Sequence, residues 1–82
     1  MEEIDMEIIG MLKEFREGLS MEQMMKKSKK LEKIGIESLA GHLDNLKKLN
    51  FVRSTLKING VGGAYKLYML TSDGSKLIYH KI

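Results

Sequence analysis

The chain has 82 residues, a formal net charge of +3 and no cysteine. A chain of this length forms one domain, residues 1–82, with a single modest core. The absence of cysteine excludes a disulfide framework and a thiolate metal site, and the two histidines lie far apart, so we expect no metal and no small-molecule cofactor. No apolar run approaches a membrane span and the acidic N-terminus is unlike a signal peptide, so we expect a cytoplasmic protein without membrane contact.

Charge is unevenly distributed along the chain. Residues 1–18 contain six acidic and two basic residues, residues 19–50 seven basic and four acidic, and residues 51–82 five basic and one acidic. This asymmetry fits a protein that turns a basic side toward a polyanion, but lysine-rich intracellular proteins in general share it. Charge alone therefore leaves the partner open.

The first predicted element is an amphipathic helix over residues 4–17. Its apolar positions recur at helical spacing, Asp5 is placed to cap it, and the glycine that follows is a natural stop. Ile9 and Met11, with Ile78 near the other end of the chain, exceed what one apolar stripe requires. We therefore expect a homodimer held by the first and last helices.

A second helix follows a short strand expected at Leu19. Ser20 and Gln23 match a capping box, in which each side chain satisfies a backbone donor of the other residue. The end of this helix stays open: either it runs past Leu31 or residues 28–33 contain a break. Its methionines predict core packing, and its lysines form either a solvated face or phosphate contacts.

The third predicted helix covers residues 36–49. Gly35 before it can adopt the positive φ of a turn, with an isoleucine on each side expected in the core. Asn50 after it is suited to a left-handed terminal residue. The leucines of one face are Leu39, Leu43, Leu46 and Leu49. The opposite face is polar, so this helix is suited to be the recognition helix of a DNA-binding domain.

Two strands are predicted at residues 51–58 and 65–71, joined by a glycine-rich tip. The tip fits no nucleotide-binding fingerprint, because it joins a strand to a strand. Alternation places one set of apolar residues on a common face of each strand: Val52, Leu56, Ile58, Tyr65, Leu67 and Met69. Thr71 can cap a short final helix, after which Leu77 and Ile78 return to the core.

These elements predict an α+β fold, a winged helix-turn-helix with a three-helix core, a C-terminal β-hairpin wing and a short final helix. Two motifs resemble those of known families. Residues 38–52, S-L-A-G-H-L-D-N-L-K-K-L-N-F-V, resemble the S-x-x-x-H-L-x-x-L-x-x-x-G-L-V run of ArsR-, MarR- and PadR-type regulators. Residues 68–74, Y-M-L-T-S-D-G, resemble the Y-x-L-T-x-x-G of MarR, PadR and small archaeal winged-helix DNA-binding proteins.

The resemblance implies a bacterial- or archaeal-type transcriptional regulator, often dimeric, with helix three (36–49) in the major groove of double-stranded DNA and the wing (58–66) on the phosphate backbone. The expected DNA contacts are Ser38, Gly41, His42, Asn45 and Lys48 on the helix and Lys57, Asn59 and Lys66 on the wing. The sequence departs from the family pattern at Gly41, which has no side chain to read a base. Glu37 and Asp44 also place negative charge on this face, where they repel phosphate unless they accept from cytosine N4.

Two other classes of function compete with DNA binding. Winged helices also serve as protein–protein interaction modules without direct DNA binding, and the acidic residues of helix three favour that alternative. An enzyme is the third class. No nucleophile–base pair, carboxylate dyad or metal cluster can be assembled from motif spacing, so we expect no catalytic activity.

Overall fold

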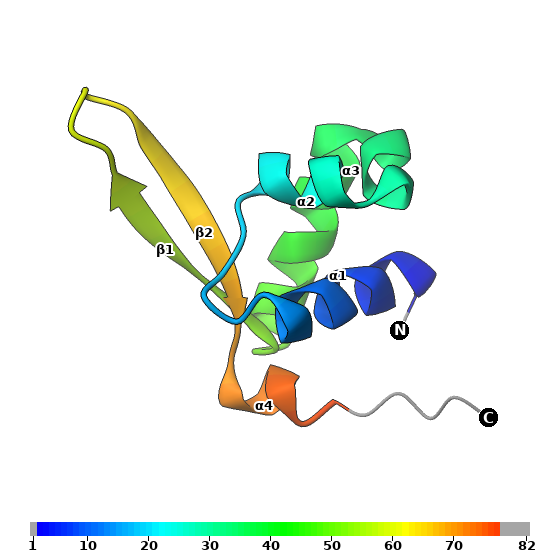
Figure 1. Cartoon of the computed structure of the whole chain (residues 1–82). Helices are drawn as coiled ribbons and strands as arrows, with labels where there is room; N and C mark the ends of the chain where they lie inside the picture. Colours follow the sequence, from blue (N-terminus) through cyan, green and yellow to red (C-terminus); the bar gives the residue numbers. More distant parts are fainter. Residues whose placement is uncertain (1, 78–82) are drawn as a thin grey trace.

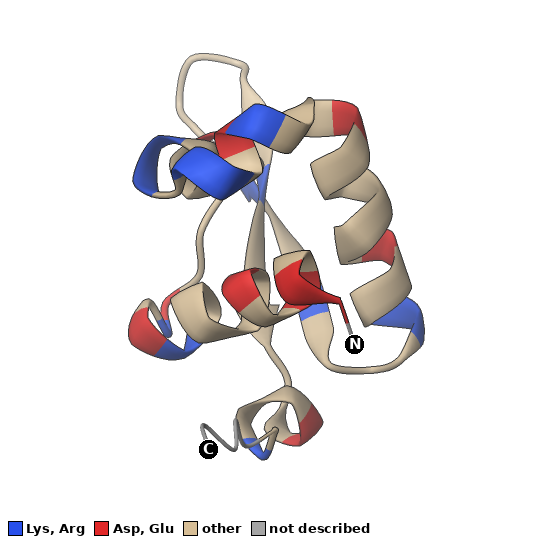
Figure 2. Cartoon of the chain, turned by 90° about the vertical axis from the view of Figure 1, so that its right-hand side faces the viewer, with Lys and Arg blue, Asp and Glu red and all other residues tan. Residues whose placement is uncertain are grey.

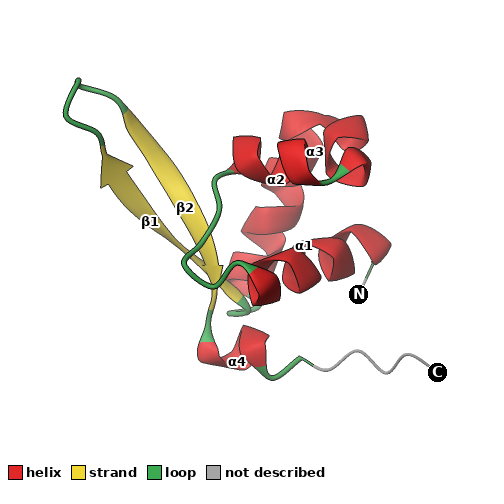
Figure 3. Ribbon diagram, in the orientation of Figure 1, coloured by secondary structure: helices red, strands yellow, loops and turns green. Residues whose placement is uncertain are grey.

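The computed structural model describes residues 2–77 (Figure 1). Within this range the elements are α1 (Glu3–Glu14), α2 (Met21–Lys27), α3 (Lys29–Lys48), β1 (Val52–Ile58), β2 (Ala64–Leu70) and α4 (Ser72–Ser75). The fold is α+β: helices come first, then an antiparallel two-stranded hairpin that projects from the helical body, then a short helix (Figure 3). This arrangement is compatible with the predicted winged helix. Among the described helices, none has the length and apolar content needed to cross a membrane.

Helix α1 begins one residue earlier than predicted and ends three residues sooner, at Glu14. The predicted cap is wrong: Glu2 is the N-cap, and Asp5 is the third helical residue of its capping box. The helix ends at this point because Phe15, which follows it, has non-helical φ −110° and ψ 76°. At Gly18, where φ is 101°, the backbone passes so close to β2 that a Cβ would lie 3.1 Å from the Tyr68 carbonyl oxygen.

A break at Ser28 separates α2 from α3, which decides between the two alternatives that the sequence left open. Ser28 has an extended backbone, and its hydroxyl oxygen accepts from the Leu31 N–H at 3.3 Å while donating to Glu7 Oε2 at 2.8 Å. It therefore caps α3 and ties that helix to α1. The predicted capping box of α2 is confirmed by reciprocal bonds between Ser20 and Gln23, 2.9 and 3.2 Å long.

Helix α3 consists of two segments, 29–34 and 36–48, because Gly35 between them has φ 85° and ψ 167°. The predicted turn is thus confirmed, and its positive φ is a conformation that side chains with a Cβ rarely adopt. The second α3 segment packs on the core through three leucines that are fully buried, Leu39, Leu43 and Leu46.

Three predictions around this segment have different outcomes. Asn50 has φ 64° and is confirmed as the left-handed terminal residue. Leu49 was placed on the buried face wrongly, because the helix ends at Lys48 and leaves Leu49 51% exposed. Of the isoleucines beside Gly35, Ile34 packs against the core but Ile36 is 48% exposed, since the turn carries it to the outer side.

The hairpin is fixed by its register and by one further contact. Val52 pairs with Leu70 and Ser54 with Tyr68, so these four residues share a face. Leu19 forms an isolated bridge with Tyr68, as predicted for a short strand at that position. Because Val52 and Tyr68 are also buried, the base of the hairpin belongs to the core.

The predicted alternation is confirmed by the register, but away from this base the apolar residues are not buried. Leu56 and Ile58 lie on the same face as Val52 but are exposed, because the strands extend beyond the helical body. On β2 the buried residue is Tyr68 and not its neighbours Leu67 and Met69, and Tyr65 is also exposed. Tyrosine has an apolar ring that fills a core position as well as an aliphatic side chain does.

The final helix α4 follows the prediction: the Thr71 hydroxyl accepts from the Gly74 N–H at 3.0 Å. Leu77 packs against the core, whereas Ile78 lies outside the described residues. The core lies where α1, α2, α3 and the hairpin base meet, and its buried apolar residues are Ile8, Ile9, Leu12, Leu19, Met24, Leu31, Leu39, Leu43, Leu46, Val52 and Tyr68.

Candidate nucleic-acid interface

The outward face of the second α3 segment carries four of the predicted contacts. Ser38, Gly41, Asn45 and Lys48 are all exposed, and their spacing places them on one side of the helix, opposite the buried leucines. No neighbour lies within 4 Å of the position that a Gly41 Cβ would occupy. In Figure 2 this segment forms the right-hand edge of the molecule. The face is therefore open to a partner.

His42 lies on the flank of this face and is turned toward α1. Its Nδ1 is 2.9 Å from Asp5 Oδ1, and its side chain is 22% exposed. Because an ionised carboxylate only accepts hydrogen bonds, the imidazole N–H donates to Asp5. Asp5 Oδ2 in turn accepts from the Glu2 N–H at 3.2 Å. His42 therefore links α3 to α1 through a residue 37 positions away in sequence. The sequence did not reveal this role because Asp5 was assigned to a helix cap.

The residues around this hydrogen bond also form a possible metal-binding cluster. Within residues 2–77, Glu2, Asp5 and His42 are the one group of three such donors whose ligand atoms lie within 4.8 Å of one another. Glu2 Oε2 is 3.8 Å from His42 Nδ1, and the Asp5 and His42 atoms are already joined by a direct hydrogen bond. A capping box and an interhelical hydrogen bond account for the cluster, so we assign it a structural role.

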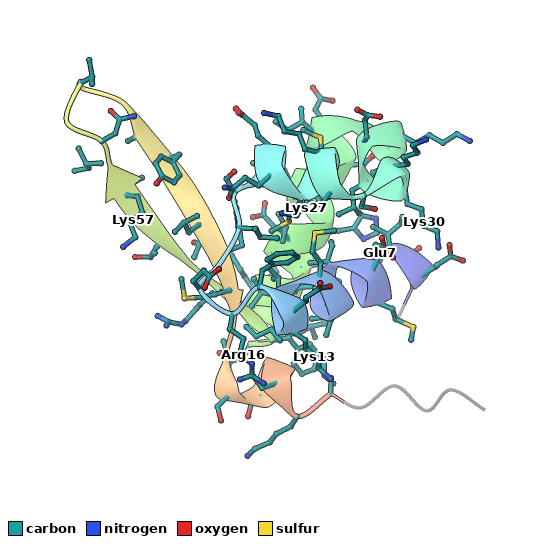
Figure 4. All side chains as sticks on the ribbon, viewed as in Figure 1. Glu7, Lys13, Arg16, Lys27, Lys30 and Lys57 are labelled. Carbon is teal, nitrogen blue, oxygen red and sulfur yellow. The ribbon has the colours of Figure 1, made fainter. Side chains whose placement is uncertain are left out.

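The two predicted wing lysines lie on opposite faces of the hairpin. Lys57 pairs with Tyr65, whereas Lys66 pairs with Leu56, and successive residues of a strand point to opposite sides. Figure 4 shows Lys57 on the side turned away from the helices. Arg53 shares the face of Lys57 and was missed, although its even spacing from Lys57 was a usable signal. A single row of phosphates on one side of the hairpin cannot meet both lysines.

Asn59, the third predicted wing contact, shapes the hairpin tip. Its Oδ1 accepts from the Val61 N–H at 3.2 Å and from the Gly63 N–H at 3.0 Å. The side chain remains exposed, so its amide N–H groups are the part left for a partner. Next to it, Ile58 is 77% and Val61 94% exposed.

Positive charge is concentrated away from the second α3 segment. Residues 36–48 contain two acids and two lysines, whereas residues 20–34 contain five lysines and two glutamates. Figure 2 shows these lysines at the upper left, over α2 and the first α3 segment. They are Lys26, Lys27, Lys29, Lys30 and Lys33. Glu3, 3.1 Å from Lys30, raises the pKa of that lysine through a hydrogen bond and through its charge.

Comparisons with known proteins identify no relative. No protein-family model matches the chain, and neither the curated proteins nor the solved structures include a match.

Proposed function

We propose that this protein is a transcriptional regulator that binds duplex DNA as a winged helix-turn-helix. In this proposal α2, the turn at Gly35 and the second α3 segment form the helix-turn-helix. The observation that carries the proposal is the exposed polar face of that segment beside a projecting hairpin with lysines on both faces. An α-helix with its side chains is about 10–12 Å wide, which fits the major groove of about 12 Å.

Each part of the surface has a separate task in the proposal. Ser38 and Asn45 face base edges, where an Asn amide can pair with adenine in two places. Gly41 has open space around it, so the helix backbone can approach the groove closely. Lys26, Lys29 and Lys33, together with the lysines of the wing, contact phosphates, which supply affinity without sequence information.

Homodimerisation is part of the same proposal, but its predicted basis needs correction. Ile9 is 1% exposed and belongs to the core of its own subunit, so it cannot contact a second copy. Met11 is half-buried, and Ile78 lies outside the described residues. Of these three residues, Met11 alone therefore remains on a described surface that a second copy can contact.

A protein-interaction module is the second candidate, and one observation favours it. Large apolar side chains are exposed on the hairpin and at the start of the second α3 segment: Ile36, Leu56, Ile58 and Val61. Apolar groups exposed in this way are more typical of a protein partner than of a phosphate backbone.

Fluorescence anisotropy on random and selected duplexes at two salt concentrations tests the proposal. Replacing Asn45 with Ala should reduce discrimination between duplexes by about 1–3 kcal/mol if its amide reads a base. The same substitution should leave thermal stability unchanged, because the side chain is exposed. His42→Ala is the matched comparison: it should lower stability by about 1–3 kcal/mol, since Asp5 loses its partner in a buried position. Failure to bind any duplex at low salt would exclude the DNA proposal and favour the protein-interaction module.

A further inference from the structure

An open groove of about 930 Å³ runs between α1 and the α2–α3 junction. Its floor is apolar and consists of Met6, Gly10, Met11 and Phe15. Met6 is 40% exposed, while Met11 and Phe15 are half-buried. An apolar strip bordered by charged side chains is typical of a protein–protein contact, and methionine adapts its shape to a partner.

The two walls of the groove carry opposite charge. The α1 wall contains Glu3, Glu7 and Glu14, and the opposite wall contains Lys27 and Lys30. Figure 4 shows Lys27 and Lys30 above Glu7 across this opening. Within the chain, the Lys27 ammonium lies 4.3 Å from the centre of the Phe15 ring. The groove therefore suits a partner that is itself apolar along one line and charged along both sides.

The chain itself has a surface of that kind. We propose that the groove is the dimer interface of this protein and receives α1 of a second copy. In a two-fold symmetric contact the same patch serves both subunits, so the acidic α1 wall of one copy meets the lysine wall of the other. Gly10 has no side chain and lets the two α1 backbones approach closely. A standard interface needs about 800 Å² from each partner, roughly one-seventh of this chain's 5751 Å² surface.

The position of the groove determines how such a dimer is arranged. On α1, the groove residues lie on the side opposite Ile8 and Leu12, which belong to the core. In Figure 1 the second α3 segment passes behind α1, and in Figure 2 it forms the right-hand side of the molecule, with α1, α2 and the first α3 segment to its left. The dimer therefore points its two outward α3 faces in opposite directions. If the protein binds DNA as proposed, a dimer of this kind binds two separate duplexes. It does not bind two neighbouring half-sites on the same duplex.

Sedimentation equilibrium from low to high micromolar concentration tests the interface. The wild-type chain should approach twice its monomer mass of 9.4 kDa. Met6→Lys should raise the dimer dissociation constant by more than about tenfold, because it places an unpaired charge in an apolar contact. Val61→Lys is the matched control, since it adds the same charge at the remote hairpin tip and should leave the mass unchanged. A wild-type monomer at high concentration, or a Met6→Lys protein that still dimerises, would overturn the proposal.

A charge-reversal pair tests the complementarity directly. Glu14→Lys and Lys27→Glu should each weaken self-association, and an equimolar mixture should restore a dimer that contains one copy of each. Two variants that dimerise as well as the wild type, or a mixture that stays monomeric, would count against the interface. Anisotropy on short duplexes with the monomeric Met6→Lys protein keeps the DNA question separate, because that protein should still bind DNA but no longer bridge two differently labelled duplexes.

Discussion

The two ends of the hairpin are built from similar residues and have opposite environments. At the base, Val52 is 2% and Tyr68 4% exposed, and Leu19 bonds to the edge of β2. At the tip, Ile58 is 77% and Val61 94% exposed. The base therefore contributes to folding, whereas the tip has no core contact that explains its apolar residues. The apolar side chains of the tip are therefore accessible to solvent or to a partner.

The largest expected effect separates these two ends through their tyrosines. Tyr68→Ala should lower the free energy of unfolding by about 3–5 kcal/mol, as for other large aromatic side chains removed from a core. Tyr65→Ala, three residues away and 46% exposed in the wild-type protein, should cost less than about 1 kcal/mol. Urea denaturation of both variants measures the difference. Equal losses in the free energy of unfolding for the two variants would contradict the distinction between a buried base and an exposed tip.

The second prediction concerns the lysines on either face of the hairpin. Lys57→Gln and Lys66→Gln should each flatten the slope of log affinity against log salt by about 0.9, because each removes one phosphate contact. Neither should alter discrimination between duplexes. Lys76→Gln, at the residue that follows α4, is the control and should leave the slope unchanged. If only one wing lysine changes the slope, the hairpin lies with one face on the DNA and not between two rows of phosphates.

The smallest expected effect appears at alkaline pH and again involves Tyr68 at the base of the hairpin. Burial, and secondarily the charge of Asp44, raises the pKa of Tyr68 above its ordinary value of 10.0. Below pH 10 the tyrosine is neutral in both the folded and the unfolded chain. Its full contribution to the free energy of unfolding is then present. As pH rises, the unfolded chain releases the proton first, so this contribution is lost as pH passes through the raised folded-state pKa. Above pH 10 the melting temperature should therefore decrease less steeply with pH for Tyr68→Phe than for the wild-type protein. Thermal denaturation at several pH values measures this, and Tyr65→Phe is the control.

Local signals predicted the turns and caps well. The capping box at Ser20, the positive φ of Gly35 and Asn50, and the Thr71 cap all have physical causes within a few residues of the chain. Asp5 shows the limit of such signals. Its sequence position is compatible with a cap, but its carboxylate is held by His42 of a distant helix.

Burial at the ends of elements could not be derived from periodicity. Leu49 and Leu56 follow the predicted apolar pattern and are exposed, because the helix stops before one and the strand extends past the core at the other. The candidate interface was affected in the same way. The sequence identified Lys57 and Lys66 as wing residues, but only the strand pairing places them on opposite faces.

The sequence by itself determined the order of the elements and the polar and apolar sides of the second α3 segment. These follow from side-chain spacing and backbone preference, which act over a few residues. The tertiary structure alone decided that His42 bonds to Asp5, that Tyr68 fills the core and that α1 and the α2–α3 junction enclose a groove. Each of these depends on which distant surfaces meet, and that is set by how the whole chain buries its apolar area at once.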